Sequence, residues 1–492
     1  MLIIVDINSV IRKTEPRVIG LNTNFLTDHA DIRQAGIGYE AALRQMGVKS
    51  LRYPGGEKSD QYFWSTPPWD APRPNLSVVG PQGYLSAFVE YIENYTAFKH
   101  KPLDFDEFMD LCQKLGAEPI LCVCFDSMYQ PSILGKITTP TKAQVLENAV
   151  EWVRYANVVK GYGVTYWELG NESYWWGSIG KAKAVDYARD FKEFARAMKA
   201  VDATIQVGAN GHVHKDARSV VELEDGPIWW QTLLEQAAAE IDFLAVHPYP
   251  CWAWGNYDYY MNHNDNFTDA VDQAREALTA WAPGPDAERI RIFATETNSA
   301  DWTAADDYSG VKGWPLVNDL GHALVLFEIL GQHLLHPKVD MAEVWNTRWT
   351  SPAEKQLWNT LNEKNELNAT GLALAVWGQN LEAEMVSITN TDLLRTFASF
   401  SAASKKLKVF IINKDKQPHV VNLELQKYPS SWTVAVSALR GNGPEDPNPV
   451  YGLVRQFSGD GNRLNLDLEP VSVSVFSFEP GTHIQALEVV KK

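Results

Sequence analysis

The feature that most constrains this 492-residue chain is a regular alternation of β-prone and helix-prone segments. Eight strands are expected, at residues 18–25, 48–53, 118–125, 164–170, 204–210, 242–249, 289–296 and 342–346. Helical spacing of apolar residues separates them, at residues 32–46, 104–115, 142–159, 182–200, 227–239, 267–281 and 317–335. This pattern predicts an α/β fold, a (β/α)8 TIM barrel. An open doubly wound sheet is the alternative, but no Gly-rich phosphate loop follows the first strand.

The apolar spacing changes at about Leu381, where helical spacing gives way to short alternating strands such as KLKVFIINK and VSVSVFSFE. Such strands, separated by turn residues, predict an additional C-terminal antiparallel β-sandwich. The apolar strand at residues 2–10 would leave its backbone groups unpaired if it stood alone, so we expect it to join that sheet. The expected domains are a barrel at residues 17–375 and a β-sandwich made of residues 1–16 and 376–492.

Composition excludes several classes of partner. The chain has 44 basic and 61 acidic residues, and its net charge of −17 argues against nucleic acid. No apolar run is long enough for a membrane span, because the best candidate, 323–335, is broken by Glu328 and His333. The first residues carry Asp6 inside a short apolar run and do not resemble a signal peptide, so a cytoplasmic protein is expected. A homo-oligomer is compatible with the sequence.

The segment TYWELGNESYWW at residues 165–176 brings a polar cluster to the end of an expected strand. In a barrel, the carboxyl ends of the strands form the mouth where chemistry takes place. Asn171 offers an amide beside the carboxyl group of Glu172, and the neighbouring tryptophans offer flat surfaces on which a sugar ring can stack. Glu172 is therefore a candidate acid/base residue.

A second carboxyl group, Glu296, ends the seventh expected strand. Cleaving a glycosidic bond with retention needs one carboxylic acid to protonate the leaving oxygen and one carboxylate about 5 Å away to form a sugar ester. Either glutamate alone is equally well explained as a helix cap or a partner of an arginine. Because the fourth and seventh strands end in the same mouth, the two together favour catalysis.

Four motifs resemble clan A retaining glycoside hydrolases, most closely the family 51 α-L-arabinofuranosidases. WELGNES at 167–173 resembles their acid/base segment, and LRYPGG at 51–56 resembles their second-strand motif. HPY at 247–249 resembles their sixth-strand His-x-Tyr, and ATETN at 294–298 resembles their nucleophile strand. Family 51 usually has Asp-Glu-Trp in that strand, and the Thr-Glu-Thr of this chain is closer to families 79 and 39.

The resemblance implies a role for each matching residue. Arg52 would lie under the nucleophile Glu296 and keep it ionised, while Asn171 would hydrogen-bond the 2-hydroxyl of the sugar. Tyr249 would orient Glu296, and His247 would line the floor of the site. The alternatives that involve no substrate are a core salt bridge for Arg52 and, for Tyr249 and His247, satisfied polar residues of the barrel interior, and we favour the roles in catalysis over them.

Other features carry less weight. His212 and His214 alternate as metal ligands do, but two histidines without a third ligand are more typical of a loop. Most tryptophans of the expected rim are better explained by packing, and Trp176 and Trp345 are the ones expected to stack on sugar. The buried-type cysteines, Cys112, Cys122, Cys124 and Cys251, are expected to be reduced.

The function that these observations favour is a retaining glycoside hydrolase, with Glu172 as acid/base and Glu296 as nucleophile. An α-L-arabinofuranosidase-like exo-enzyme acting on plant-type oligosaccharides and polysaccharides is expected, with neither metal nor cofactor. A clan A β-glycanase or β-glycosidase, of the endoglucanase, xylosidase or glucuronidase type, is one alternative. A non-catalytic carbohydrate-binding barrel and a metal-dependent hydrolase are alternatives from other classes.

Overall fold

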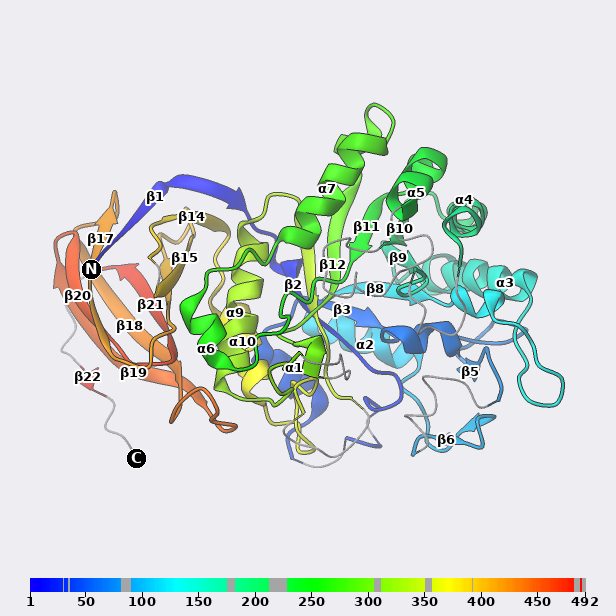
Figure 1. Ribbon diagram of the computed structural model, residues 1–492, viewed down its shortest axis with the longest axis horizontal. Helices are drawn as coiled ribbons and strands as arrows, with labels where there is room; N and C mark the ends of the chain where they lie inside the picture. The colour runs from blue at the N-terminus through cyan, green and yellow to red at the C-terminus, as the bar shows by residue number, and fades with distance from the viewer. Residues whose placement is uncertain are drawn as a thin grey trace.

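The structure, a computed structural model, describes residues 1–29, 31–33, 36–80, 90–174, 182–211, 228–304, 311–349, 356–391, 393–481 and 487–488. A barrel surrounded by helices occupies one end of the molecule and a β-sheet the other (Figure 1). The predicted fold class is confirmed. No helix among the described residues is long and apolar enough to cross a membrane.

Eight parallel strands close the barrel in the spatial order β10-β11-β12-β13-β2-β3-β8-β9. Their bounds are Ile19–Asn22 (β2), Ser50–Tyr53 (β3), Glu118–Val123 (β8), Tyr166–Leu169 (β9), Gln206–Asn210 (β10), Phe243–Val246 (β11), Arg291–Thr297 (β12) and Val339–Val344 (β13). Their residues are almost all buried, as expected for parallel strands that helices cover on one side and the barrel core fills on the other. Inside the barrel, the rings of Phe243 and Phe293 stack with centroids 4.3 Å apart.

A helix follows each barrel strand. These helices are Tyr39–Met46 (α1), Phe105–Leu115 (α2), Lys142–Val153 (α3), Ala184–Val201 (α4), Trp229–Ala237 (α5), Asp269–Trp281 (α7), Leu320–Leu335 (α9) and Ala369–Asn380 (α10). Capping boxes at Asp104 and Thr141 precede α2 and α3. Both helices begin within one residue of the starts expected from the sequence, because a capping box is a local signal. Two short helices, Tyr257–Asn262 (α6) and Asp286–Arg289 (α8), precede α7 and β12.

Among the eight barrel helices, α1 and α10 differ most from the expectation. α1 begins at Tyr39 and not near residue 32, because Gly38 is its N-cap and Gly36 has a positive φ of 73° that a helix cannot hold. α10 was not expected, and it supplies the eighth helix of the barrel. The expected boundary between residues 375 and 376 falls inside α10, so we propose that the barrel extends to Asn380.

A long connection follows β3 and folds over one side of the barrel mouth. It contains a short 3-10 helix at Glu57–Gln61 (η2) and the two-stranded hairpin of Tyr62–Phe63 (β4) and Asn75–Leu76 (β5). A second small hairpin pairs Ile92–Glu93 (β6) with Ala97–Phe98 (β7). Because η2 comes soon after the end of β3, it lies at the mouth of the barrel.

The remaining strands form one continuous ten-stranded sheet in the order β20-β17-β1-β14-β15-β16-β21-β18-β19-β22. Their bounds are Leu2–Lys13 (β1), Glu384–Ile388 (β14), Leu394–Phe400 (β15), Leu407–Asn413 (β16), His419–Gln426 (β17), Ser431–Arg440 (β18), Val450–Asp460 (β19), Arg463–Leu468 (β20), Ser472–Pro480 (β21) and Leu487–Glu488 (β22). β1 pairs antiparallel with β14 and parallel with β17. The N-terminal strand therefore lies among strands that are nearly 400 residues away in the chain.

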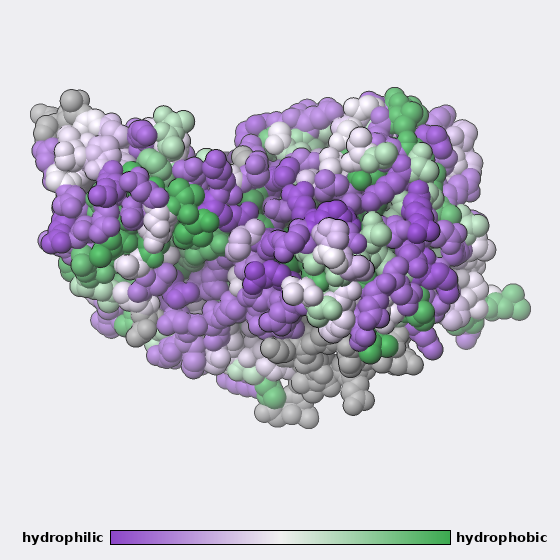
Figure 2. Space-filling view, turned by 90° about the horizontal axis from the view of Figure 1, so that it is seen from above, coloured by the Kyte–Doolittle hydropathy of each residue, from purple (hydrophilic) through white to green (hydrophobic). Residues whose placement is uncertain are grey.

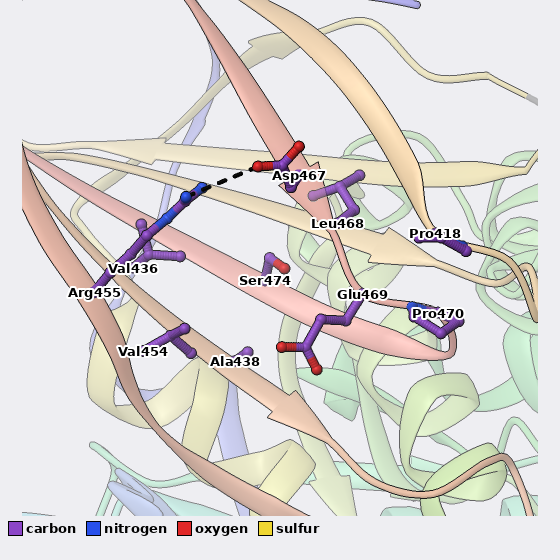
Figure 3. Close-up of a pocket in the computed structure, with 10 residues that line it drawn as sticks. All are labelled: Pro418, Val436, Ala438, Val454, Arg455, Asp467, Leu468, Glu469, Pro470 and Ser474. Carbon is purple, nitrogen blue, oxygen red and sulfur yellow. Dashed lines mark ion pairs between the residues drawn. The ribbon is translucent and has the colours of Figure 1, made fainter. Parts of the chain in front are cut away.

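The sheet curls, so that β19 and β20 face one another without pairing. A pocket of about 280 Å³ lies at this seam, where Arg455 of β19 and Asp467 of β20 are 3.9 Å apart (Figure 3). The face of the molecule in Figure 2 is mostly hydrophilic, with apolar side chains gathered toward the end that holds the sheet. Exposed apolar residues of the sheet include Val420, Val450 and Leu453.

Candidate active site

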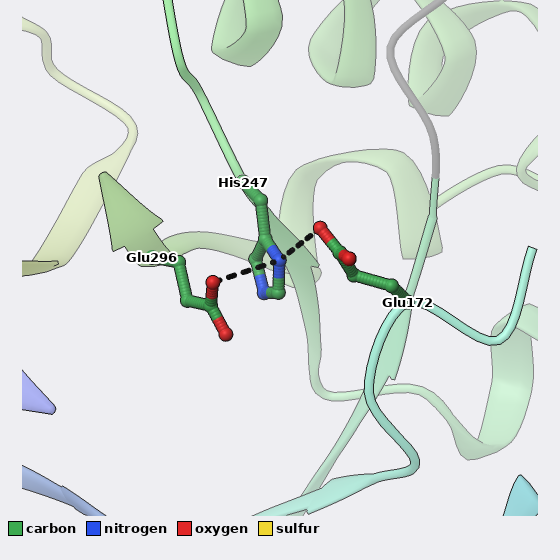
Figure 4. A group of neighbouring side chains, drawn as sticks. All are labelled: Glu172, His247 and Glu296. Atoms are coloured by element: carbon green, nitrogen blue, oxygen red, sulfur yellow. Dashed lines mark hydrogen bonds and ion pairs between the residues drawn. The ribbon is translucent and has the colours of Figure 1, made fainter. Parts of the chain in front are cut away.

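The carboxyl groups of Glu172 and Glu296 converge at the mouth of the barrel. Glu172 follows the end of β9, Glu296 lies near the end of β12, and both side chains are buried, with 8% and 6% of each residue exposed. His247, just after β11, lies between them (Figure 4). One oxygen of each carboxyl group and a ring nitrogen of His247 all lie within 4.8 Å of one another.

The backbone at Glu172 is held in an unusual conformation. Its φ is +50°, in the left-handed region that a glutamate rarely adopts, and Gly170 before it has a φ of +75°. Asp126 accepts hydrogen bonds from Asn171 N (3.3 Å) and Ser173 Oγ (2.8 Å) on either side of Glu172. Asn210 accepts another from Ser173 N at 2.9 Å. These anchors aim the Glu172 carboxyl group into the mouth and offset the strain of its backbone.

Arg52, fully buried at the end of β3, holds one side of the site together. Its Nη1 donates to Glu296 Oε1 at 2.9 Å, and its Nη2 donates to Asn171 Oδ1 at 2.8 Å. Its Nε and Nη2 also donate to the two oxygens of Glu168, at 2.8 and 3.1 Å. A fixed positive charge thus lies beside the Glu296 carboxylate, where the motif placed it.

Glu168 and Asn22 belong to this network, and neither was predicted from the sequence. Glu168 is fully buried in β9, and Asn22 at the end of β2 accepts from Arg52 Nη1 at 3.0 Å. A signal for Glu168 was present, because a carboxylate inside a buried strand must have a partner. Asn22 carried no comparable signal, since an amide at a strand end also suits a turn.

His247 bridges the two carboxyl groups and does not only line the floor. Its Nδ1 lies 2.9 Å from Glu172 Oε1 and 3.7 Å from Glu296 Oε2. Its Nε2 lies 3.1 Å from Thr295 Oγ1, whose hydroxyl donates to Glu168. The Thr295 oxygen then accepts a hydrogen bond from His247 Nε2–H. This contact fixes the imidazole ring with Nδ1 facing Glu172. Burial lowers the pKa of His247, but Glu296 and Glu172 outweigh it, so the pKa is raised overall.

Tyr249 and a group of tryptophans form the opposite wall. Tyr249 donates to Glu296 Oε2 at 3.0 Å and packs edge-on against Trp302. Trp345, which follows β13, is 5% exposed, and its ring meets that of Trp349 with centroids 5.7 Å apart. A sugar ring in the mouth would therefore have an apolar wall beside the carboxyl group of Glu296.

Two charged residues of η2, neither of them predicted from the sequence, also reach this region. The buried ammonium of Lys58 lies 4.5 Å from the ring centroid of Trp345 and 4.9 Å from that of Trp349. Burial lowers the pKa of Lys58 to about 7, although Glu296 and Glu57 oppose this. Burial and repulsion from Glu172 and Glu296 raise the pKa of Glu57 well above its usual value. A neutral Glu57 would be a hydrogen-bond donor at the mouth.

The other expected residues divide into those that the structure places and those outside the described residues. The side-chain oxygen of Asn171 is engaged by Arg52, so its NH2 group is what it can offer to a ligand. Trp64 and Trp254 pack in the core, as anticipated for most of the tryptophans. Trp176, His212 and His214 lie outside the described residues.

Among the described residues, Glu172, His247 and Glu296 are the group whose ligand atoms are close enough to hold a metal ion. One imidazole and two carboxylates are suitable ligands for a divalent transition metal. However, the guanidinium of Arg52 lies 2.9 Å from Glu296, and its positive charge opposes a second cation there. The same geometry suits two carboxyl groups that can each exchange a proton with the histidine between them.

Comparison with known proteins agrees with this fold. A family model described as the alpha-L-arabinofuranosidase 1 domain matches residues 42–265. The probable alpha-L-arabinofuranosidase C of Aspergillus fumigatus is 25% identical over 231 residues, which are 43% of this chain and 39% of that protein. The intracellular exo-alpha-(1->5)-L-arabinofuranosidase of Acetivibrio thermocellus is 26% identical over 218 residues, 42% of this chain and 37% of that protein. The match thus spans about two fifths of these curated relatives.

The fold extends the likeness to nearly the whole chain. The crystal structure of an alpha-L-arabinofuranosidase from Thermotoga maritima in complex with arabinose superposes with a TM-score of 0.71 and 19% identity. The superposition covers 97% of this chain and 99% of that one. The family-model match therefore confirms that the chain resembles the α-L-arabinofuranosidases, and the superposition confirms the fold that this resemblance implies.

Proposed function

We propose that this protein is a retaining glycoside hydrolase, similar in action to an α-L-arabinofuranosidase, with Glu172 as acid/base and Glu296 as nucleophile. The proposal rests on one observation above all, the approach of the two carboxyl groups to within 4.8 Å at one barrel mouth. Retaining enzymes hold their two carboxyl groups about 5 to 5.5 Å apart, whereas inverting enzymes leave about 6.5 to 9.5 Å for a water molecule. The short separation supports retention.

In the first step, an oxygen of Glu296 attacks the anomeric carbon of the sugar and forms a covalent ester. The bond from that carbon to the leaving oxygen breaks, and Glu172 gives this oxygen a proton. Arg52 and Tyr249, at 2.9 and 3.0 Å, orient the Glu296 carboxylate for attack. The Asn171 amide is placed to donate to a sugar hydroxyl beside it.

In the second step, water attacks the same carbon and releases Glu296. Glu172 now acts as base and takes the proton of that water, which returns it to its starting form. His247 Nδ1, 2.9 Å from Glu172 Oε1, can carry this proton between turnovers. The charges of Glu296 and Glu172 raise the pKa of His247, which favours acceptance of a proton by its imidazole.

The proposed substrate is an α-L-arabinofuranoside at the end of an oligosaccharide or polysaccharide. Two curated relatives are named as alpha-L-arabinofuranosidases, and one of them is named an exo-enzyme of α-(1→5) linkages. The buried carboxyl groups and the tryptophan wall suit a single terminal sugar in a pocket. A β-glycanase or β-glycosidase with the same double displacement is the second candidate.

A panel of p-nitrophenyl glycosides tests this proposal: α-L-arabinofuranoside, β-D-xyloside, β-D-glucoside and β-D-glucuronide. The arabinofuranoside is expected to be cleaved fastest, and NMR of the first sugar released should show a retained anomeric configuration. The matched control is Glu296→Gln, which keeps the size of the side chain but removes the nucleophile.

Faster cleavage of a β-glycoside would instead support the second candidate, a β-glycanase or β-glycosidase. An inverted product would contradict the mechanism. Hydrolysis of none of the four, with Glu296→Gln indistinguishable from wild type, would favour a non-catalytic barrel.

A further inference from the structure

A second concave site lies beside the mouth, between the β4–β5 hairpin and the start of α3. It is a pocket of about 390 Å³, a size typical of small-molecule sites. Both of its walls come from segments that follow barrel strands, β3 and β8, so it opens on the same rim as the mouth. The catalytic carboxyl groups are not among its lining residues.

The hairpin that forms one wall is firmly attached. Trp64 Nε1 donates to the backbone oxygen of Asn148 in α3 at 3.0 Å, and Asn148 Nδ2 donates back to the backbone oxygen of Ser65 at 3.1 Å. The backbones of Val79 and Thr138 form a β-bridge across the pocket edge. The concavity is therefore a fixed feature of the fold, as a preformed binding site requires.

The lining combines aromatic rings with uncharged polar groups. Phe63 and Trp69 are half-buried, and the polar groups include the side chains of Asn75, Thr138 and Gln144. Among the described residues that line the pocket, Glu147 is the one with a charged side chain. This chemistry suits a neutral ligand with an apolar face and many hydroxyl groups, which describes a sugar. An anionic ligand would meet Glu147 and a protein of net charge −17.

Trp69 lies in a tight turn with a backbone conformation that is unusual for its residue type. Its φ is +64°, in the left-handed region that a tryptophan rarely adopts, and its amide donates to Thr66 O at 3.1 Å. The ring centroids of Trp69 and buried Trp64 are 6.0 Å apart and the ring planes are tilted by 31°, so one face of the Trp69 indole packs against Trp64. Strain of this kind is stored where a side chain must point in a given direction.

The pocket is also coupled to the mouth through η2. Ser77, in the pocket wall, donates through Oγ to the backbone oxygen of Asp60 at 2.8 Å. Asp60 belongs to the same short helix as Glu57 and Lys58. A chain bound in the pocket would therefore lie against the same connection that forms one side of the mouth.

From these observations we propose that this pocket is a second carbohydrate-binding site, which holds a neutral segment of the polysaccharide while the mouth acts on it. The choice of a polysaccharide rests in part on the proposed glycosidase function. Trp69 is the platform for one sugar ring, and the amide side chains at the edge bond its hydroxyls. The pocket then affects how polymers bind and leaves small substrates unaffected.

The test is affinity electrophoresis in native gels that contain soluble arabinan, arabinoxylan or xyloglucan. Wild type and Trp69→Ala are compared, each also carrying Glu296→Gln so that the polymer is not consumed. Trp69→Ala is expected to weaken the affinity for at least one polymer about tenfold, as for loss of a central aromatic anchor. In the background that retains Glu296, the kcat/KM of Trp69→Ala on the aryl glycoside should equal that of wild type.

Trp281→Ala is the matched control, because Trp281 is also half-buried but ends α7, away from the pocket and the mouth. Thr138→Arg fills the pocket from an exposed position and should reproduce the loss if Trp69→Ala fails to fold. Equal retardation of wild type and both pocket variants would overturn the proposal. Retardation that depends on Trp69, in a protein that cleaves no aryl glycoside, would uphold this site and refute the proposed catalysis.

Discussion

At the residue scale, the site is defined by charges that are buried in pairs. Arg52 faces two carboxylates, Glu168 and Glu296, and all three are nearly or fully removed from water. Burying an unpaired charge would cost several kcal/mol. Because Glu168 offsets the charge of Arg52, Glu296 remains available to a substrate. Glu172 lies 2.9 Å from the ring of His247 and not beside an arginine, so its neighbour can exchange a proton with it.

This difference between the two glutamates predicts different losses on substitution. An activated aryl glycoside hardly needs protonation, so Glu172→Ala should still form the glycosyl-enzyme quickly and hydrolyse it slowly. Stopped-flow absorbance should show a burst of phenol, followed by slow turnover that added azide accelerates, because the anion can enter the space that the side chain left. Glu296→Ala should give no burst, since no nucleophile remains.

The comparison of leaving groups provides the control. Glu172→Ala should lose far more activity on a substrate with a poor leaving group than on an activated one, whereas Glu296→Ala should lose both alike. Equal losses for Glu172→Ala on both substrates, or azide rescue of Glu296→Ala with a retained product, would reverse the assignment of roles.

At the element scale, β1 shows how a local pattern becomes a tertiary contact. Ile3, Val5 and Ile7 alternate with more exposed residues, and these three side chains pack in the core of the C-terminal sheet. The second half of the same strand, including Val10, is exposed. The strand thus contributes apolar burial only over its first part, although its backbone pairs with β14 as far as Lys13.

Two substitutions of the same type within this strand should therefore differ. Val5→Ala removes buried methyl groups and is expected to lower the free energy of unfolding by about 2 kcal/mol. Val10→Ala, at a site with 44% exposure, should change it by less than about 0.5 kcal/mol. Urea denaturation followed by circular dichroism measures both, and equal effects would mean that β1 does not pack as described.

At the scale of the whole molecule, the apolar core of the barrel extends onto one face of the sheet. Trp377 of α10 stacks on Phe327 of α9 at 4.6 Å and contacts Phe410 of β16 at 4.4 Å. Arg395 of β15 pairs with buried Glu328 of α9 at 2.7 Å. Because the same cluster of side chains spans both parts, we expect the protein to unfold as one unit.

The free energy of unfolding varies with pH through buried carboxyl groups such as that of Glu343, inside the barrel. Burial raises the pKa of Glu343 to about 8, although Ser50 donates to it at 2.5 Å. The folded state then binds a proton that the unfolded state has lost, so this group lowers stability as pH rises from about 4.5 to about 8. The cost is about 3 kcal/mol at pH 7.

Glu343→Gln should remove this cost, because glutamine resembles the protonated acid. Its melting temperature is expected to exceed that of wild type at pH 8 and to approach it near pH 4.5, measured by differential scanning calorimetry. Glu424→Gln is the opposite control, since hydrogen bonds from Gln426 and Arg463 lower the pKa of Glu424. That variant should be no more stable than wild type at pH 8, and a less stable Glu343→Gln at pH 8 would contradict the argument.

The sequence by itself determined the barrel, the change to alternating strands, and the two glutamates at strand ends. These follow from apolar periodicity and strand-end chemistry, which are local properties of the chain. Only the tertiary structure decided that Glu168 and Asn22 complete the Arg52 network, that His247 lies between the carboxyl groups, and that η2 brings Glu57 and Lys58 to the mouth. Each of these joins residues from different strands or connections, and their approach depends on barrel closure, which no local pattern encodes.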